Sequence, residues 1–280
     1  MGKFTGVLLA SDFDNTLLNT ETARRTGSAV PELPERNRRA LTYFMDQGGT
    51  FAVATGRALA AIEKFVDQIP MNAPAVICNG AALYDFQKGE YLELINLDRE
   101  ACLRCQEVLD RFPTAAAEAY PLENVIHTVR PNLYTRQHEH VTHVAVQADA
   151  SLREVPQPIT KLMFEECHET LETIRAYIVS QPWAARYEVF FSDRTLLEVT
   201  ARGASKGAMV RRLAERLGIA PEHVYCAGDE ANDLSMLTMA AEGFAPANCV
   251  EAVRACGATI VCDADHGALA DIVEILDRRY

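Results

Sequence analysis

No apolar run in this sequence of 280 residues is long enough to cross a membrane. The first residues hold one lysine and then enter an apolar stretch, without the basic region, apolar core and small-residue cleavage site of a secretory leader. Basic residues are also scarce, with 27 Lys and Arg against 39 Asp and Glu and a net charge of −12. These absences argue against membrane spans, broad nucleic-acid binding and attachment to anionic membrane surfaces, and we expect a cytoplasmic protein.

A disulfide framework is also absent, because the 8 cysteines are scattered among apolar residues. Cys102 and Cys105 form a Cys-x-x-Cys inside a helical pattern over residues 98–112. No second such pair supplies further zinc ligands, so packing is favoured over zinc or redox chemistry. Three histidines crowd an expected strand over residues 141–148, where a solvated strand face is favoured over a metal site. They are His138, His140 and His143.

The apolar run Val7 to Ala10 is followed closely by two carboxylates, Asp12 and Asp14. A continuous apolar run predicts a buried strand of a parallel sheet, and ligands of such sheets bind beyond the carboxyl ends of the strands. In an extended chain both side chains would point to one face and repel each other, unless a pKa rises or a cation binds. Asn15 tolerates the left-handed conformation that a sharp exit from the strand would need. Alone, the pattern is also that of a simple turn after a strand.

The same strand-and-helix unit recurs further along the chain. A strand over residues 50–54 ends in Thr55-Gly56-Arg57, and a helical pattern follows over residues 58–68. This makes a phosphate-sized site, because the first N–H groups of a helix are unpaired and its dipole favours anions. A third strand over residues 75–78 ends at Asn79. The alternation predicts an α/β fold with a doubly wound parallel sheet.

The pattern changes in the middle of the chain. Residues 85–187 contain a hairpin, amphipathic helices and alternating strands punctuated by prolines, and the earlier pattern of strand and helix resumes afterwards. A chain of 280 residues can form one large domain or two smaller ones. We therefore predict a catalytic core over residues 1–84 and 188–280, and an inserted α+β cap domain over residues 85–187.

Two later segments complete a polar set. Lys206 begins a helix, and a strand over residues 224–227 runs into an acidic loop over residues 228–233. Together with the first strand end, this loop would bring four carboxylates into one crevice, where they are unstable without a cation. Oxygen ligands with no His or Cys nearby suit Mg²⁺. The four carboxylates are Asp12, Asp14, Asp229 and Asp233.

A phosphoryl group could be held against such a cation by Thr55, Lys206 and backbone amides. Alone, Lys206 could equally be a solvated helix residue, and Asp229 a helix N-cap. Together these residues favour phosphoryl transfer, in which a carboxylate can attack phosphorus and form an aspartyl-phosphate.

Four motifs, taken in chain order, resemble those of the haloacid dehalogenase (HAD) superfamily of phosphotransferases. They are Asp12 with Asp14, Thr55-Gly56, Lys206, and Asp229 with Asn232 and Asp233. The long insertion resembles the type IIB cap of the Cof-type, sugar-phosphatase-like branch. The resemblance covers essentially the whole chain and implies a Rossmann-like HAD core with an α+β cap that sets substrate specificity. One departure is Asn15, where the family usually has Gly, and Asn adopts similar backbone angles.

The resemblance also implies a role for each matching residue. It makes Asp12 the nucleophile and Asp14 the general acid and base. Phosphate would be bound by Thr55, Gly56, Lys206 and Asn232. Mg²⁺ would be held by Asp12, Asp14 and Asp229. The supporting residues would be Asp233, Asn79 and Arg57.

The function that this resemblance implies is a Mg²⁺-dependent phosphatase acting on a small phosphorylated metabolite such as a sugar phosphate. Two alternatives stay open, a phosphomutase with the same intermediate and a non-catalytic sugar-phosphate sensor. The intact set of Asp12, Asp14, Lys206 and Asp229 argues against the sensor. Binding alone would not need a second carboxylate two residues after the first.

Overall fold

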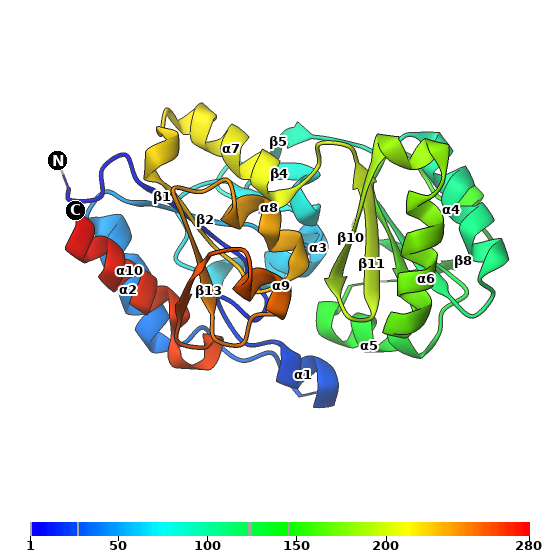
Figure 1. The fold of residues 1–280 in the computed structure, drawn as a ribbon, viewed down its shortest axis with the longest axis horizontal. Helices are drawn as coiled ribbons and strands as arrows, with labels where there is room; N and C mark the ends of the chain where they lie inside the picture. Colours follow the sequence, from blue (N-terminus) through cyan, green and yellow to red (C-terminus); the bar gives the residue numbers. More distant parts are fainter. Residues whose placement is uncertain (1, 27, 123–124, 145) are drawn as a thin grey trace.

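The computed structural model describes residues 2–26, 28–122, 125–144 and 146–280. A parallel sheet of strands from both ends of the chain lies in one half of the molecule (Figure 1). In spatial order its strands are β14 (Thr259–Val261), β13 (Glu242–Pro246), β12 (Val224–Ala227), β1 (Leu8–Ser11) and β2 (Thr50–Val53). β1 pairs in parallel with both β12 and β2, with Leu8 opposite Val224 and Thr50. The carboxyl ends of these three strands therefore meet at one edge of the sheet.

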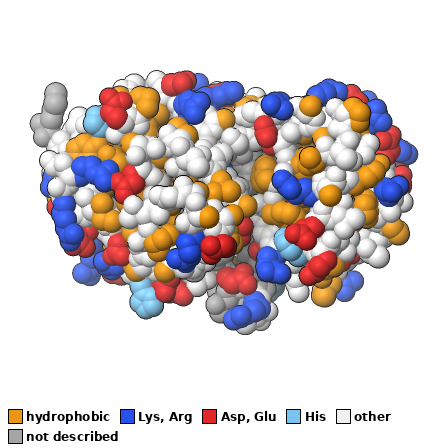
Figure 2. Space-filling model, viewed as in Figure 1, with side chains coloured by type: hydrophobic (Ala, Val, Ile, Leu, Met, Phe, Trp, Pro, Cys, Tyr) orange, Lys and Arg blue, Asp and Glu red, His pale blue; other side chains and the backbone are white. Residues whose placement is uncertain are grey.

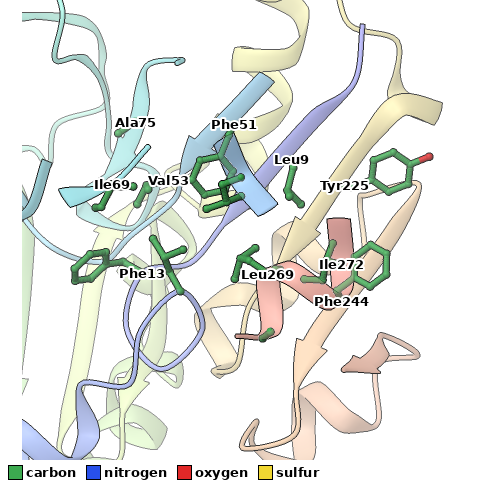
Figure 3. Packing of buried hydrophobic residues seen from close by; sticks show 14 of the residues in the cluster. Leu9, Phe13, Phe51, Val53, Ile69, Ala75, Tyr225, Phe244, Leu269 and Ile272 are labelled. Carbon is green, nitrogen blue, oxygen red and sulfur yellow. The ribbon is translucent and has the colours of Figure 1, made fainter. Parts of the chain in front are cut away.

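Helices cover both faces of this sheet. One face packs against α2 (Glu35–Asp46) and α10 (Ala268–Arg279), and the other against α7 (Lys206–Leu217), α8 (Leu234–Leu237) and α9 (Glu251–Arg254). Because successive strand residues point to opposite faces, Leu9 joins the first cluster, whereas Leu8 and Ala10 join the second. Figure 3 shows Leu9 near Leu269 and Ile272 of α10. The predicted doubly wound α/β fold is confirmed.

The predicted third parallel strand is only marginally part of this sheet. β3 (Ala75–Ile77) touches it through one parallel bridge between Ala54 and Val76, and otherwise pairs antiparallel with β4 (Ala82–Asp85). β5 (Glu90–Leu94) completes a small antiparallel sheet with β4. The short helices α1 (Glu21–Thr26) and α3 (Leu59–Ile62) precede these strands. Short 3₁₀ segments are η1 (Glu63–Gln68), η2 (Cys78–Gly80), η3 (Leu152–Glu154), η4 (Pro182–Arg186), η5 (Pro221–His223), η6 (Ala231–Asp233) and η7 (Ala264–His266).

A second large sheet forms the other half of the molecule. In spatial order it contains β10 (Tyr187–Asp193), β11 (Leu196–Ala201), β9 (Ile159–Glu165), β6 (Ala116–Pro121), β7 (Ile126–Val129) and β8 (Val146–Asp149). Its strands pair antiparallel except for β7 with β8. The helices α4 (Arg99–Arg111) and α6 (His168–Val179) cover the face that points away from the parallel sheet (Figure 1). We call the segment from β6 to β11 together with α4 the cap.

The ends of the second sheet differ from the predicted segment boundaries. The hairpin of β10 and β11 pairs with β9, so residues up to Ala201 belong to the second sheet, although the prediction assigned residues from 188 on to the core. The predicted boundary after residue 84 likewise falls inside β4, whose hairpin with β5 packs on the core side. The pairing of β11 with β9 decided the first point, and the local pairing of β4 with β5 decided the second. That the two halves act as separate core and cap domains remains our proposal.

The strand predicted over residues 141–148 is wrong in its first part. The chain forms the helix α5 (Leu133–Thr142) and reaches an extended conformation only from Val146. Asn132 starts this helix with a capping box, because its side chain accepts from the backbone N–H of Tyr134 and Thr135. His138 and His140 are therefore helical, and His143 is the C-cap.

The surface carries charges of both signs. Figure 2 shows Lys and Arg side chains interspersed with Asp and Glu side chains on the viewed face. Among the residues that the structure describes, no helix combines the length and the apolar character needed to cross a bilayer.

Candidate active site

A cavity of about 120 Å³, partly open to solvent, lies where the edge of the parallel sheet faces the cap. The core lines it with residues that the sequence analysis selected: Asp12, Asp14, Gly56, Arg57, Asp229 and Asn232. The cap adds Tyr120, His138, Lys161 and Glu198.

Lys206 connects two of the predicted acids. Its Nζ donates to Asp12 Oδ1 at 2.6 Å and to Asp233 Oδ1 at 2.7 Å, and the lysine is 1% exposed. It is the first residue of α7, whose N-cap is Ser205, as the sequence predicted. Burial alone would lower the pKa of Lys206, but Asp12 and Asp233 raise it above its ordinary value, so the ammonium stays charged. A buried cation is thus fixed beside the Asp12 carboxylate.

Asp12 itself follows β1 and is anchored by its backbone N–H, which donates to Ala227 O at 2.8 Å. Burial raises the pKa of Asp12 to about 7, and Lys206 opposes this shift. Asp12 is therefore partly protonated near neutral pH until further positive charge arrives. Further positive charge beside Asp12 would favour its ionised form.

The donor set at this edge fits a hard cation. Asp12, Asp229 and Asp233 each offer a carboxylate oxygen within 4.8 Å of the others. Burial, followed by the charges of Asp12 and Asp233, raises the pKa of Asp229 well above its usual range. Asp233 has both oxygens engaged, by Lys206 and by the backbone N–H groups of Asp229 and Glu230, which leaves Asp12 and Asp229 as the better ligands. Carboxylate oxygens are the ligands that Mg²⁺ prefers.

Asp14 lies outside this carboxylate cluster. Arg57 donates from Nε to Asp14 Oδ2 at 2.9 Å and from Nη2 to Asp14 Oδ1 at 2.8 Å, and Thr20 donates to Oδ1 at 2.7 Å. Burial alone would raise the pKa of Asp14, but Arg57 lowers it below its usual value. The predicted use of this side chain as a metal ligand lacks geometric support, because a bidentate arginine occupies both oxygens.

The sharp exit from β1 has the backbone that the sequence predicted. Asn15 has φ +54°, in the left-handed region. Its side-chain oxygen accepts from the backbone N–H of Thr20 at 3.1 Å and of Glu21 at 2.9 Å. These bonds hold the loop in a conformation that places the Thr20 hydroxyl beside Asp14. Thr16, in the same loop, donates to Asp229 Oδ1 at 2.8 Å.

The second motif lies beside the first. Thr55 is fully buried, and its Oγ1 accepts from the backbone N–H of Arg57 at 3.1 Å. A Cβ on Gly56 would lie 2.9 Å from Asn79 Nδ2, so only glycine fits there without displacing Asn79. Asn79, with φ +55°, accepts from Asn232 Nδ2 at 2.9 Å. Asn79 thus brings the second and fourth motifs together.

Sequence reasoning missed four polar residues of this site: Thr16, Thr20, Lys161 and Glu198. The two threonines lie between recognised motifs, where no spacing marked them. Lys161 and Glu198 carried a weak signal, as charged residues inside largely buried strands of the cap. A buried charge in such a strand needs a partner, but the sequence did not indicate which.

The fold and this site define an α/β enzyme whose acidic centre lies at the carboxyl edge of a parallel sheet, beneath a second sheet. The sequence matches the haloacid dehalogenase-like hydrolases over residues 9–273, and the chain belongs to that family. The predicted family and enzyme class, a phosphoric monoester hydrolase, agree with this match and with phosphatase-named relatives.

Curated relatives that share 27% identity with the chain include a bacterial and a plant protein. Pyridoxal phosphate phosphatase YbhA of Escherichia coli aligns over 95% of this chain and 97% of its own length. A protein named endoribonuclease YBEY, chloroplastic, of Arabidopsis thaliana aligns over 94% of this chain, which spans only 45% of that relative. A solved HAD subclass IIB sugar phosphatase is 21% identical, with a TM-score of 0.82 and coverage of 97% of this chain and 99% of its own. That structural likeness supports the fold.

Proposed function

We propose that this chain is a Mg²⁺-dependent phosphatase that hydrolyses a small phosphorylated metabolite through an aspartyl-phosphate on Asp12. The observation that supports this most is the position of Asp12, which is 2.6 Å from the buried Lys206 and clustered with Asp229. Such a carboxylate is surrounded by groups that hold a phosphoryl group and balance its charge.

In the first step, an Asp12 oxygen bonds to phosphorus, the bond to the leaving-group oxygen breaks, and that oxygen takes a proton from Asp14. In the second step, water attacks phosphorus, Asp14 takes a proton from the water, and the bond to Asp12 breaks, which releases phosphate. Lys206, Thr55 and the backbone around Gly56 hold the phosphoryl oxygens. Bound Mg²⁺ would be held by Asp12 and Asp229, and would neutralise the phosphoryl charge.

The contacts of Asp14 place a condition on this mechanism. With Arg57 on both oxygens, Asp14 is ionised and suited to accept a proton, as the second step requires. As the acid of the first step it must carry a proton, which requires that Arg57 no longer holds both oxygens. We therefore propose that bound substrate or the leaving-group oxygen displaces one of these two contacts.

The substrate that we propose is a sugar phosphate. The polar cap residues that line the cavity suit a hydroxylated leaving group. One relative is named for pyridoxal phosphate and one structural neighbour for sugars, so these related proteins differ in substrate.

Release of inorganic phosphate tests the proposal. We expect turnover of p-nitrophenyl phosphate and of a sugar phosphate with Mg²⁺, little with Ca²⁺, and none in excess chelator, because Ca²⁺ relaxes the octahedral geometry that the transfer needs. Phosphate should appear in proportion to the substrate lost. Isomerised sugar phosphate without free phosphate would indicate the mutase, and binding without turnover would indicate the sensor.

A further inference from the structure

Lys161 and Glu198 form a buried ion pair in the cap that has no role in the mechanism above. They lie on the adjacent strands β9 and β11. Lys161 is opposite Thr200, and Glu198 lies two residues before Thr200 on the same strand. Diagonal neighbours of this kind project from the same face of a sheet. Lys161 is 3% exposed and Glu198 2%, and Nζ lies 3.1 Å from Oε2. Both line the cavity that also holds Asp12.

This pair also contacts the core beside the expected phosphate position. Lys161 Nζ donates to Gly56 O at 3.0 Å, and Glu198 Oε2 accepts from Asn79 Nδ2 at 2.7 Å. A phosphoryl group between Asp12 and Gly56 would therefore have its leaving group next to Lys161 and Glu198. The two cap residues are fixed in place by the same loops that hold the phosphate.

Each member of the pair keeps unused hydrogen-bonding capacity. An ammonium has three N–H donors, and Lys161 directs two of them at Gly56 and Glu198. The bonds to Glu198 both use Oε2, which leaves Oε1 as an acceptor without a hydrogen bond from the described residues. A donor and an acceptor side by side match a hydroxyl group, which both accepts and donates.

The charges around the pair disfavour a second anion. Glu118 and Glu165 are fully buried on the same sheet face, and Asp193 and Glu230 line the cavity. His138 is shared by Glu118 at 3.0 Å and Glu165 at 3.6 Å. The positive charge of Lys161 is already balanced by Glu198, so a distal phosphate would meet mainly carboxylates.

We propose that Lys161 and Glu198 form the subsite that selects the leaving group, and that this subsite takes a hydroxylated leaving group and rejects one that carries a second phosphate. The proposal rests on the proposed function and adds the selectivity of the same cavity. Lys161 donates to a hydroxyl oxygen next to the ester carbon, and Glu198 Oε1 accepts from a hydroxyl of the same group.

The first test uses the unmodified protein with Mg²⁺ and compares kcat/KM across matched esters. The probes are p-nitrophenyl phosphate, three hydroxylated monophosphates (glucose 6-phosphate, ribose 5-phosphate and glycerol 3-phosphate) and glucose 1,6-bisphosphate. We expect at least one hydroxylated monophosphate to exceed the bisphosphate by about ten-fold or more. An equal or greater kcat/KM for the bisphosphate would overturn the proposal, as would turnover of p-nitrophenyl phosphate with none of the hydroxylated esters.

The second test uses Glu198→Gln, with Glu172→Gln as the matched control on the outer side of the cap, where the Glu172 side chain is 64% exposed. Glu198→Gln should lower kcat/KM for the preferred hydroxylated ester by about ten-fold more than it lowers kcat/KM for p-nitrophenyl phosphate. Glu172→Gln should change neither. An equal loss on both esters would make Glu198 merely structural and refute the subsite.

Two further measurements separate the possible failures. Absence of p-nitrophenyl phosphate turnover by the unmodified protein would refute the proposed function itself, which is a different result from turnover without selectivity. If Glu198→Gln does not fold, Lys161→Met should show the same ester-dependent loss of kcat/KM. The comparison of esters with the unmodified protein tests the proposal without any variant.

Discussion

The two large sheets of this protein hold polar groups in different places. In the parallel sheet, apolar side chains fill both faces, and Asp12 and Asp229 come just after the strands β1 and β12. In the cap sheet, one face packs against α4 and α6, and the other carries Glu118, Lys161 and Glu198 within the strands.

Helix coverage explains this difference. A parallel sheet needs a crossover between each pair of strands, so helices occupy both faces and only the strand ends remain for polar chemistry. The cap sheet has α4 and α6 on one side, and its other face meets α5 and the core. Its charged residues can therefore sit in mid-strand, provided that each finds a partner. The core supplies a site at an edge, and the cap supplies a surface above it.

The largest expected effect concerns the acid at the edge of the core sheet. Asp12→Asn removes the attacking oxygen, and turnover should fall to background while substrate binding remains. Phosphate release and rapid-quench labelling measure this, with label expected on Asp12 of the unmodified protein. Asp67→Asn, an exposed change on the core, is the control. Label on another residue, or full turnover by Asp12→Asn, would show that the core edge does not hold the nucleophile.

The second prediction concerns Asp14, which is on the same edge but faces Arg57. Asp14→Asn should reduce kcat for a sugar phosphate by about 10² to 10⁴, because proton transfer to the leaving group is lost. The loss should be smaller for p-nitrophenyl phosphate, since p-nitrophenolate leaves without a proton. Steady-state kinetics on both esters provide the measurement. Equal losses would count against the general-acid role.

The third prediction compares the buried lysines of the two halves. Lys206 neutralises two buried carboxylates and Lys161 one, so Lys206→Met should cost about 3–5 kcal/mol of unfolding free energy and Lys161→Met less. Urea denaturation in the presence of chelator measures both, because a bound cation would mask the loss at Asp12. A larger loss for Lys161→Met would mean that the ion pair in the cap matters more to folding than the one in the core.

The smallest expected effect uses cysteines as reporters of the two halves. Burial raises the pKa of Cys105 in α4 and of Cys226 in β12. Because the thiolate is the reactive form, a raised pKa means that less of it exists at pH 8 than for an ordinary thiol, and that reactivity rises only at higher pH. Iodoacetamide with mass spectrometry should leave both thiols unlabelled in the native protein at pH 8.

With increasing urea, Cys105 should become labelled before Cys226, because the cap sheet carries buried charged residues within its strands, whereas the buried side chains within the parallel strands are almost all apolar. Labelling of fully denatured protein gives the reference for each thiol. Earlier labelling of Cys226 would reverse the stability order that we infer from the two sheets.

Much of the core site could be predicted because its signals are local. The apolar run before Asp12, the left-handed Asn15 and the helix start at Lys206 each depend on a few neighbouring residues, and the structure has all three features. Parallel strands then bring their carboxyl ends to one edge, so the meeting of the motifs follows from the fold class alone.

Other contacts depended on which atoms meet across long separations. Asp14 was expected to bind a metal, but Arg57, 43 residues away, takes both of its oxygens. Asp233 was expected near the other acids, but its contact with Lys206, 27 residues away, was not. The histidines near residue 140 became helical because of the capping box at Asn132, which the strand-like pattern after it concealed.

The sequence by itself determined the α/β core, because hydrophobic runs and the residues that end them act over short distances, and its motifs resembled those of the family that the chain belongs to. Only the tertiary structure decided where the cap sheet ends. It also decided that Glu198 contacts Lys161, 37 residues away, and Asn79, 119 residues away. Strand order and register set these contacts, and a shift of one residue would point each of these side chains to the opposite face.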